Sequence, residues 1–256
     1  VMAESGAHAI FAEQDYSPYA LRRDGECAAA LPLTLVDGLV GLPVGAVRKD
    51  DGDPYTVFSP FKRRWLALSQ PPAPRLAPER IPTPAGIASE ALPQAQARAD
   101  AAPVQFTPGE DEAQARLQRF VEGDGAPIFD YANNRNRPDL NGTSQLSPYL
   151  RFGMLSAQQA FAAAEEAAGR ASTAEARKGV ETWRSELIWR EFYINILHHF
   201  PQARTGAFRP EYSDIAWHND EEDFAAWCEG RTGYPFVDAA MRQLVATGWM
   251  HNRARM

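Results

Sequence analysis

Residues 109–256 carry a strong helical pattern, in which apolar residues recur at helical spacing after signals typical of helix starts. Four helices are predicted, beginning near Pro108, Ser156, Ser172 and Pro235. The first three follow capping boxes, in which Ser or Thr precedes Glu or Gln by three positions: Thr107 with Glu110, Ser156 with Gln159, and Ser172 with Glu175. We expect the first helix to end near Val121 and the second after the segment AQQAFAAAEEAA. The third is expected to reach about His199, and the fourth to run to the end of the sequence. With no convincing strand, this half is predicted to be all-α.

The first 70 residues are less regular. Leu33–Val36 and Val57–Phe58 have the composition of short strands, Asp50–Pro54 that of a turn, and Pro60–Leu68 that of a helix with proline at its start. Nine prolines follow between Pro71 and Pro108. Such a stretch buries too little apolar surface to form a domain, so we interpret it as a connector between two bodies.

Composition excludes several classes of protein. Hydrophobic residues make up 45% of the 256 residues, an ordinary value for a globular protein. The formal net charge of −7 excludes a surface that is basic throughout, as in some nucleic-acid-binding proteins, but it does not exclude a local basic patch. Two cysteines, Cys27 and Cys228, exclude a disulfide scaffold and indicate a reducing compartment. No apolar run is long enough for a membrane span, and residues 1–10 lack the features of a signal peptide.

The segment 182–197 is the first candidate site. At about 100° per residue, one face of this helix gathers two tryptophans with an acid and a base, whereas the other face is aliphatic: Trp183, Glu186, Trp189, Arg190 and Tyr193. Two interpretations have equal weight. Glu186 and Arg190 form an ordinary pair within the helix, with the tryptophans packing on neighbours, or the face lines a polar and aromatic cavity for a planar ligand.

Two further segments are weaker candidates. The last helix would align six residues on one face: Asp238, Arg242, Val245, Trp249, Asn252 and Met256. Taken alone, this stripe is more typical of a core. Residues 141–148 (NGTSQLSP) combine glycine, hydroxyls and proline before a helical region, which suits a phosphate cradle, with Tyr131, Arg135 and Arg137 as further donors. A polar connecting loop is the simpler alternative.

Three longer motifs then stand out: GTSQLSPYLRFG, WRSELIWREFY and WCEGRTGYPFVDAAMRQLVATGWMHNRARM. In this order they resemble the photolyase/cryptochrome family, most closely the class I photolyases that repair cyclobutane pyrimidine dimers. FAEQDYSPYALRRD and DPYTVFSPFKRRW are similar to the later part of that family's N-terminal domain.

The resemblance implies a fold and a domain division. Residues 1–70 are expected to be the C-terminal part of a Rossmann-like α/β antenna domain, 71–108 an interdomain linker, and 109–256 the N-terminal part of an all-α FAD/DNA-binding domain, incomplete at its C-terminus. Because Val1 is not an initiator and the sequence stops within a predicted helix, we expect an interior piece of a longer protein. Such a piece alone is expected to hold FAD poorly and to be inactive.

The resemblance also assigns residues to roles. FAD contacts are expected from Tyr131, Thr143, Ser144, Gln145, Leu146, Ser147 and Trp183. The lesion is expected to meet Glu186, Trp189, Asn252 and Met256, with Trp189 stacking on it and Glu186 protonated so that it donates a hydrogen bond. DNA contacts are expected from Arg190, Glu191, Phe192, Tyr193, Asn252 and Arg253. Trp217 matches the surface end of an electron-transfer chain, and Trp227 is a candidate accessory relay.

The implied function is light-driven repair of UV-damaged DNA by an excited, reduced FAD, in a bacterial-type cytoplasmic monomer. Asn252 and Met256 favour the dimer enzyme, because family members that repair (6-4) photoproducts carry histidines there. A second antenna chromophore, folate or deazaflavin, is expected, but its identity stays open, since Ala20 stands where folate-binding members place glutamate. A cryptochrome-type blue-light photoreceptor is the main alternative, and a helical interaction domain without cofactor is the third.

Overall fold

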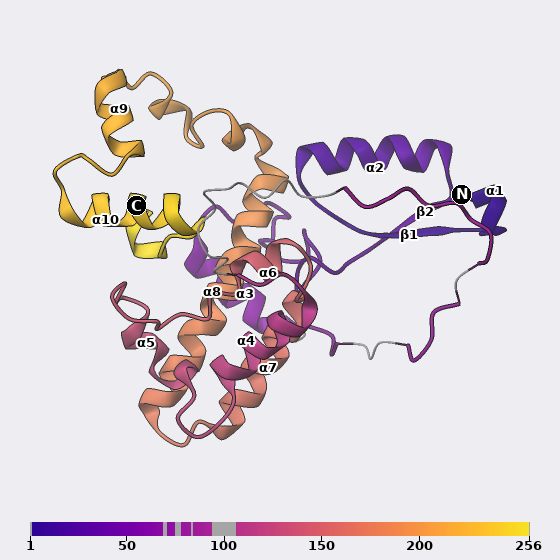
Figure 1. Cartoon of the computed structure of the whole chain (residues 1–256), viewed down its shortest axis with the longest axis horizontal. Coiled ribbons are helices and arrows are strands. Elements are labelled where there is room, and N and C mark those ends of the chain that lie inside the picture. The colour runs from indigo at the N-terminus through magenta and orange to yellow at the C-terminus, as the bar shows by residue number, and fades with distance from the viewer. Residues whose placement is uncertain (1, 69–70, 75–77, 83, 94–105, 256) are drawn as a thin grey trace.

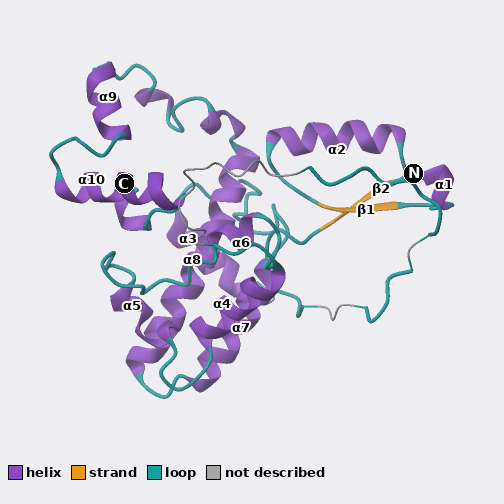
Figure 2. Cartoon of the chain, viewed as in Figure 1, coloured by secondary structure: helices purple, strands orange, loops and turns teal. Residues whose placement is uncertain are grey.

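A small α/β unit precedes a larger helical region in the computed structural model (Figure 1). The structure describes residues 2–68, 71–74, 78–82, 84–93 and 106–255. In the α/β unit, a short helix α1 (Met2–Ser5) leads to strand β1 (Ile10–Glu13), helix α2 (Pro18–Ala30) and strand β2 (Leu33–Val36). The two strands pair in parallel, with Ile10 opposite Leu33, and α2 makes the crossover (Figure 2).

The predicted strand Leu33–Val36 is confirmed, whereas β1 and α2 were not predicted as elements. The prediction of a strand at Val57–Phe58 is wrong. Val57 is the extended residue that precedes helix α3 (Phe58–Ala67), so the helix predicted from Pro60 begins two residues earlier. Pro60 is tolerated there because the first-turn N–H groups of a helix have no partner within it.

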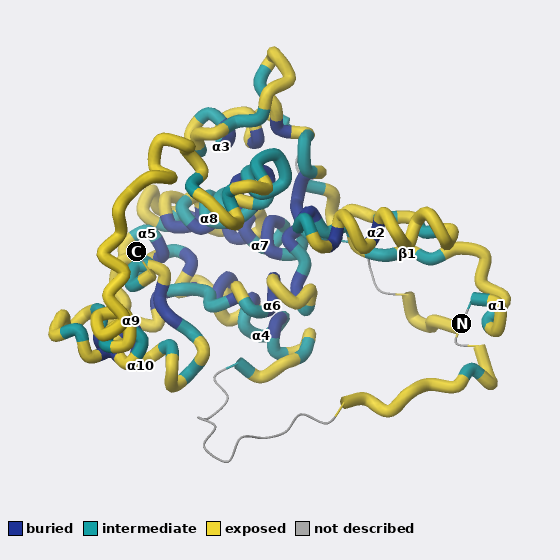
Figure 3. Tube along the Cα trace, turned by 90° about the horizontal axis from the view of Figure 1, so that it is seen from above, coloured by how far each residue is buried: buried dark blue, intermediate teal, exposed yellow. Residues whose placement is uncertain are grey.

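The helical region packs around one long central helix, α8 (Ala174–His199). Its neighbours are α3, the 3-10 turn η1 (Pro127–Asp130), α5 (Tyr131–Asn134) and α7 (Ala157–Arg170). Helix α4 (Glu110–Val121) packs on α7 and η1, and the short helix α6 (Ser147–Arg151) precedes α7 in the chain. The fully buried Ala160, Ala164 and Ala167 form a small-residue stripe along α7, and both α7 and α8 run through the buried interior (Figure 3). Small side chains allow two helices to approach closely, so α8 is held at a fixed distance from α7.

The helix ends test the capping predictions. Ser156 and Gln159 form the predicted reciprocal box at the start of α7. The box at Thr107 is wrong, because α4 begins after Gly109, whose backbone φ of 123° only glycine adopts readily, and no side chain caps the helix. For α8, the cap is Thr173 rather than Ser172.

The C-terminal segment differs most from the prediction. After the 3-10 turns η2 (Pro201–Arg204) and η3 (Pro210–Tyr212) comes an unpredicted helix, α9 (Glu221–Cys228), capped by Asp220. Helix α10 (Pro235–Thr247) does not continue to the end, since Gly248 takes a left-handed conformation that terminates it. The predicted stripe from Asp238 to Met256 is therefore not one helical face: Trp249 lies beyond the helix and Asn252 begins a separate 3-10 turn, η4 (Asn252–Ala254).

The described parts of 71–108 contain neither helix nor strand. Cys27 and Cys228 are both free thiols. Among the described residues, no helix has the length and apolar character needed to cross a membrane.

Candidate functional site

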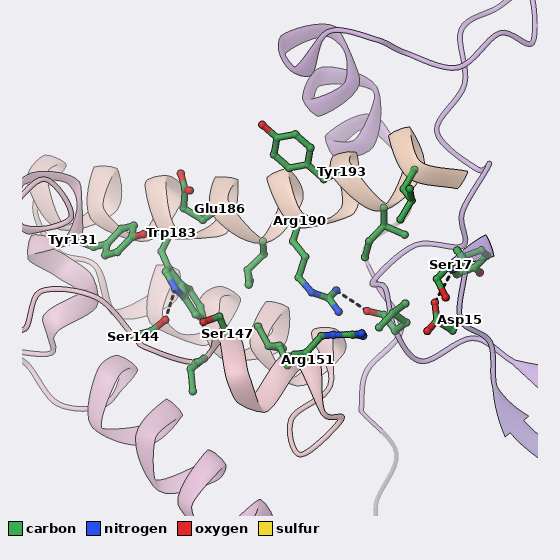
Figure 4. A pocket seen from close by; sticks show the side chains of 17 residues that line it. Asp15, Ser17, Tyr131, Ser144, Ser147, Arg151, Trp183, Glu186, Arg190 and Tyr193 are labelled. Atoms are coloured by element: carbon green, nitrogen blue, oxygen red, sulfur yellow. Dashed lines mark hydrogen bonds between the residues drawn. The ribbon is translucent and has the colours of Figure 1, made fainter. Parts of the chain in front are cut away.

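A cavity of about 730 Å³ lies along α8, between the hydroxyl-rich loop before α6 and the turn that follows β1 (Figure 4). One face of α8, with residues at helical spacing, lines it; of the face predicted from the sequence, only Trp189 is missing from the lining. The α8 side chains lining the cavity include Trp183, Glu186, Leu187, Arg190, Tyr193, Ile194 and Leu197. Its walls are thus mostly apolar and aromatic, with a few polar groups, which is the usual composition of a site for a small organic ligand.

Glu186 and Arg190 do not pair with each other. Glu186 instead forms an ion pair with Arg135, with Oε1 and Nη1 2.5 Å apart. Arg190 donates from Nη1 to the Leu39 carbonyl at 2.6 Å, and its partial burial lowers the pKa of its guanidinium. Of the two interpretations left open by the sequence, the pair within the helix is therefore wrong.

Aromatic rings build one end of the cavity. Trp183 is 3% exposed and lies against Phe120, with ring centroids 5.2 Å apart; Phe120 in turn contacts Tyr131 edge-on. Burial, followed by the nearby charge of Glu186, raises the pKa of Tyr131 to about 12, so its hydroxyl stays protonated at neutral pH. These flat, rigid surfaces suit a planar ligand.

The hydroxyl-rich loop is divided between two cavities. Ser144, Leu146 and Ser147 line the large one, and Ser144 Oγ accepts a long hydrogen bond of 3.4 Å from Trp183 Nε1. Thr143 and Gln145 line a neighbouring cavity of about 340 Å³ together with Arg116 and Arg119. The five loop residues that we predicted as FAD contacts therefore line two neighbouring cavities, and Ser144 lines both.

Gly142 in this loop lies very close to the end of α5. A Cβ on Gly142 would lie 2.7 Å from Asn134 Cβ and 2.8 Å from the Asn134 carbonyl oxygen. Only glycine lets the loop approach the end of α5 this closely. Gly142 therefore helps to place the hydroxyls beside Tyr131.

Two predicted lesion contacts lie outside the cavity lining. Trp189 stacks on Phe58 of α3, with ring centroids 3.6 Å apart and planes 9° from parallel. Asn252 is exposed in η4, and the next residue, Arg253, donates to Asn136 Oδ1 at 2.9 Å and 2.7 Å. Met256 lies outside the described residues. Of the four residues expected to meet the lesion, only Glu186 therefore lines the large cavity in the part of the chain that the structure describes.

The predicted DNA-contacting segment is divided by burial. Tyr193 is 62% exposed at the cavity, whereas Glu191 and Phe192 are buried on the opposite side of α8. A buried side chain cannot touch a DNA surface, so including Glu191 and Phe192 among the DNA contacts was wrong. Of the two predicted relay residues, Trp217 is 71% exposed, and Trp227 stacks on Phe224 in α9.

Sequence reasoning missed the far wall of the cavity. It is formed by Leu39, Leu150 and Arg151, and by the turn after β1: Asp15, Tyr16 and Ser17. The turn carried a usable signal, because Ser17 caps α2 immediately after a parallel strand, and such strand ends commonly border binding crevices.

Comparison with known proteins agrees with this architecture. The fold is a βαβ unit joined to a helical region, and the cavity along α8 combines aromatic, hydroxyl-bearing and cationic side chains. Residues 1–80 match the family model described as DNA photolyase, and residues 183–256 match that of the FAD binding domain of DNA photolyase.

Curated relatives match this sequence along almost its whole length. The deoxyribodipyrimidine photo-lyase of Synechococcus sp. is 40% identical, covering 98% of this chain and 54% of the relative. That of Thermus thermophilus is 39% identical with the same coverage, and that of Escherichia coli is 34% identical, covering 100% of this chain and 54% of the relative. The chain spans about half the length of the curated relatives that it matches.

Solved structures show the same fold. A bacterial class III photolyase from Agrobacterium tumefaciens is 28% identical, with a TM-score of 0.83 over 99% of this chain and 54% of that one. A Synechocystis cryptochrome, 23% identical, has a TM-score of 0.74 over 99% of this chain and 55% of that one, a likeness of fold alone. The chain belongs to the photolyase/cryptochrome family.

Proposed function

We propose that this protein binds FAD in the large cavity and repairs cyclobutane pyrimidine dimers in DNA by light-driven electron transfer. The observation that carries the proposal is the lining of that cavity, which joins flat aromatic walls to hydroxyls and a guanidinium. The relatives called deoxyribodipyrimidine photo-lyase support the reaction, and their sequences extend well beyond the part matched here.

The donor set fits a dinucleotide. Trp183 and Tyr131 provide surfaces for planar rings, while the Ser144 and Ser147 hydroxyls and the Arg190 guanidinium suit phosphate oxygens. Thr143 and Gln145, beside Arg116 in the adjoining cavity, extend this polar lining. FAD when bound supplies the electron that opens the cyclobutane ring and then accepts it back.

The chain's own residues would bind and orient the lesion. A lesion inside a duplex must leave the stack to reach an enclosed site, and photolyases are among the established examples of base flipping. Glu186, held by Arg135 at the cavity, is our candidate for contacting the pyrimidine edges, together with Asn252. Arg253 and the exposed Tyr193 are candidates for contacts with the DNA backbone.

The remaining assignments belong to the same proposal. Residues 1–70 would be part of an antenna domain, 71–108 a linker and 109–256 part of the FAD- and DNA-binding domain. Trp217 would be the surface end of an electron-transfer chain, with Trp227 as an accessory relay. The protein would act as a monomer and carry a second chromophore.

The test is a pair of measurements on the purified full-length protein. We expect flavin absorbance in the protein and loss of cyclobutane dimers from irradiated DNA under blue light but not in the dark. Bound flavin without light-dependent repair would contradict the enzyme assignment and favour the photoreceptor alternative. Absence of flavin after reconstitution with FAD would contradict the whole proposal and leave a helical interaction domain.

Substitution of Trp189 tests whether this residue binds the DNA lesion or only stabilises the fold. If Trp189 stacks on a flipped-out base, Trp189→Ala lowers the preference for dimer-containing over undamaged DNA by about 1–3 kcal/mol. Because Phe58 now covers the ring at 3.6 Å, the base would have to displace or join that stack. The measurement is the ratio of the two dissociation constants at one salt concentration.

Phe58→Ala is the matched control, since it removes the same aromatic stack from the other side. We expect it to destabilise the protein comparably while keeping the preference for damaged DNA. An equal loss of preference in both variants would mean that Trp189 acts only through packing on α3, and the stacking role would be refuted.

A further inference from the structure

The side of α8 opposite the cavity holds a buried carboxylate that the proposed function does not use. Glu191 is 1% exposed. Its Oε1 accepts from the Gly41 N–H, and its Oε2 accepts from Trp65 Nε1 at 2.7 Å and from the Leu42 N–H at 3.4 Å. One side chain therefore joins α8 to α3 and to the loop 39–45, which lies about 150 positions away in the sequence.

The same stretch of α8 holds that loop at two more points. Asn195 Oδ1 accepts from the Gly45 N–H at 3.3 Å. Arg190 donates to the Leu39 carbonyl at 2.6 Å, and this is the arginine that lines the large cavity. Three side chains of α8 therefore hydrogen-bond to the backbone of this loop, and Glu191 makes the contacts at its centre, Gly41 and Leu42.

Packing at Gly41 shows that the middle contact is closely fitted. A Cβ there would lie 2.7 Å from Phe161 Cε2 and 2.8 Å from Glu191 Oε1. No larger residue allows the backbone N–H to come so near the carboxylate without moving a ring or the acid. A buried carboxylate is tolerated only when its oxygens are hydrogen-bonded, so the loop and Glu191 depend on each other.

We propose that Glu191 is a positioning residue for the cavity: it fixes the loop 39–45, so that the Leu39 carbonyl holds the Arg190 guanidinium in place for the ligand. The ligand role of Arg190 rests on the proposed function. The anchoring of the loop does not, because it follows from the contacts of Glu191 alone.

Glu191→Gln tests the proposal in the full-length protein, with the exposed Glu181→Gln as the matched control on the same helix. An amide presents an N–H₂ group to one set of the donors that the carboxylate accepts, so one side of the anchor is lost. We expect faster hydrogen exchange at the Gly41 and Leu42 amides and about tenfold weaker FAD binding to the apoprotein. Glu181→Gln should change neither.

A double variant shows whether Glu191 acts through Arg190. In an Arg190→Gln background, Glu191→Gln should weaken FAD binding by less than about twofold, because the group that it positions is already gone. A further tenfold loss there would overturn the proposal, as would unchanged FAD affinity in the single variant despite faster exchange. Wild-type protein that fails to bind FAD would instead refute the proposed function, and the exchange measurement would still test the anchor.

If Glu191→Gln does not fold, Trp65→Phe replaces it, because it removes the Nε1 donor at 2.7 Å and keeps an aromatic ring beside Phe161, at the cost of part of the buried indole. We expect a smaller loss of FAD affinity, about threefold, that disappears in the Arg190→Gln background. A loss that persists in that background would overturn the proposal equally.

Discussion

Replacing Trp183 by alanine is expected to lower the free energy of unfolding by about 3–5 kcal/mol, the usual cost of truncating a buried aromatic residue. The indole is 3% exposed, packs against Phe120 at 5.2 Å and donates to Ser144, so its loss opens a void between the cavity and the core. FAD binding should fall with it, because the same ring is a wall of the cavity. Chemical denaturation and flavin titration measure the two effects.

Trp217→Ala is the control, since the substitution is identical and the ring is 71% exposed. Its free energy of unfolding should change by no more than about 0.5 kcal/mol, as for other surface positions. Similar losses in the two variants would show that Trp183 is not buried as described. A destabilised Trp183→Ala protein that binds FAD with unchanged affinity would remove Trp183 from the site.

Helices were the most predictable part of the molecule, because their signals are local. The box at Ser156 and the end of α8 at His199 were confirmed, since cap and helix lie within a few residues of each other. The stripe through Asn252 failed for a local reason as well. It assumed that the helix continues through Gly248, which is a favoured residue for ending one.

The cavity was predictable only on the side that one helix supplies. Spacing along α8 placed Trp183, Glu186 and Arg190 on one face, and all three line the cavity. Their partners come from far along the chain: Arg135 is 51 positions from Glu186, and Leu39 is 151 positions from Arg190. Periodicity carries no information on such pairs. Of the two interpretations left open, the Glu186–Arg190 pair was therefore the one that used only local information, and it was wrong.

A glycine within α8 illustrates how tertiary packing overrides helix propensity. Gly179 is a poor helix former in the interior of a 26-residue helix, yet it is buried against the 3-10 turn η1. A Cβ at this position would lie 2.7 Å from the carbonyl carbon of Phe129 and closer still to the carbonyl oxygens of Ile128 and Phe129. The obstacle is backbone, which cannot swing aside as a side chain does. The absence of a side chain therefore allows α8 to approach η1 and the adjacent Tyr131.

Gly179→Ala is accordingly expected to destabilise the protein by about 3 kcal/mol, at the upper end of the usual cost of overpacking, although alanine is the better helix former. Because α8 must move away from η1, Tyr131 and Trp183 should separate and FAD affinity should fall. The measurements are the denaturation midpoint and FAD affinity in the full-length protein.

Gly25→Ala in α2 is the same substitution, but here we expect the stability of the protein to rise instead of fall. No atom lies within 4 Å of a Cβ there, so helix propensity alone acts and the protein should gain about 0.5–1 kcal/mol. A stabilising effect of Gly179→Ala as well would mean that α8 and η1 are not in close contact. The arrangement that brings Tyr131 beside Trp183, and with it the aromatic end of the proposed FAD site, would then be wrong.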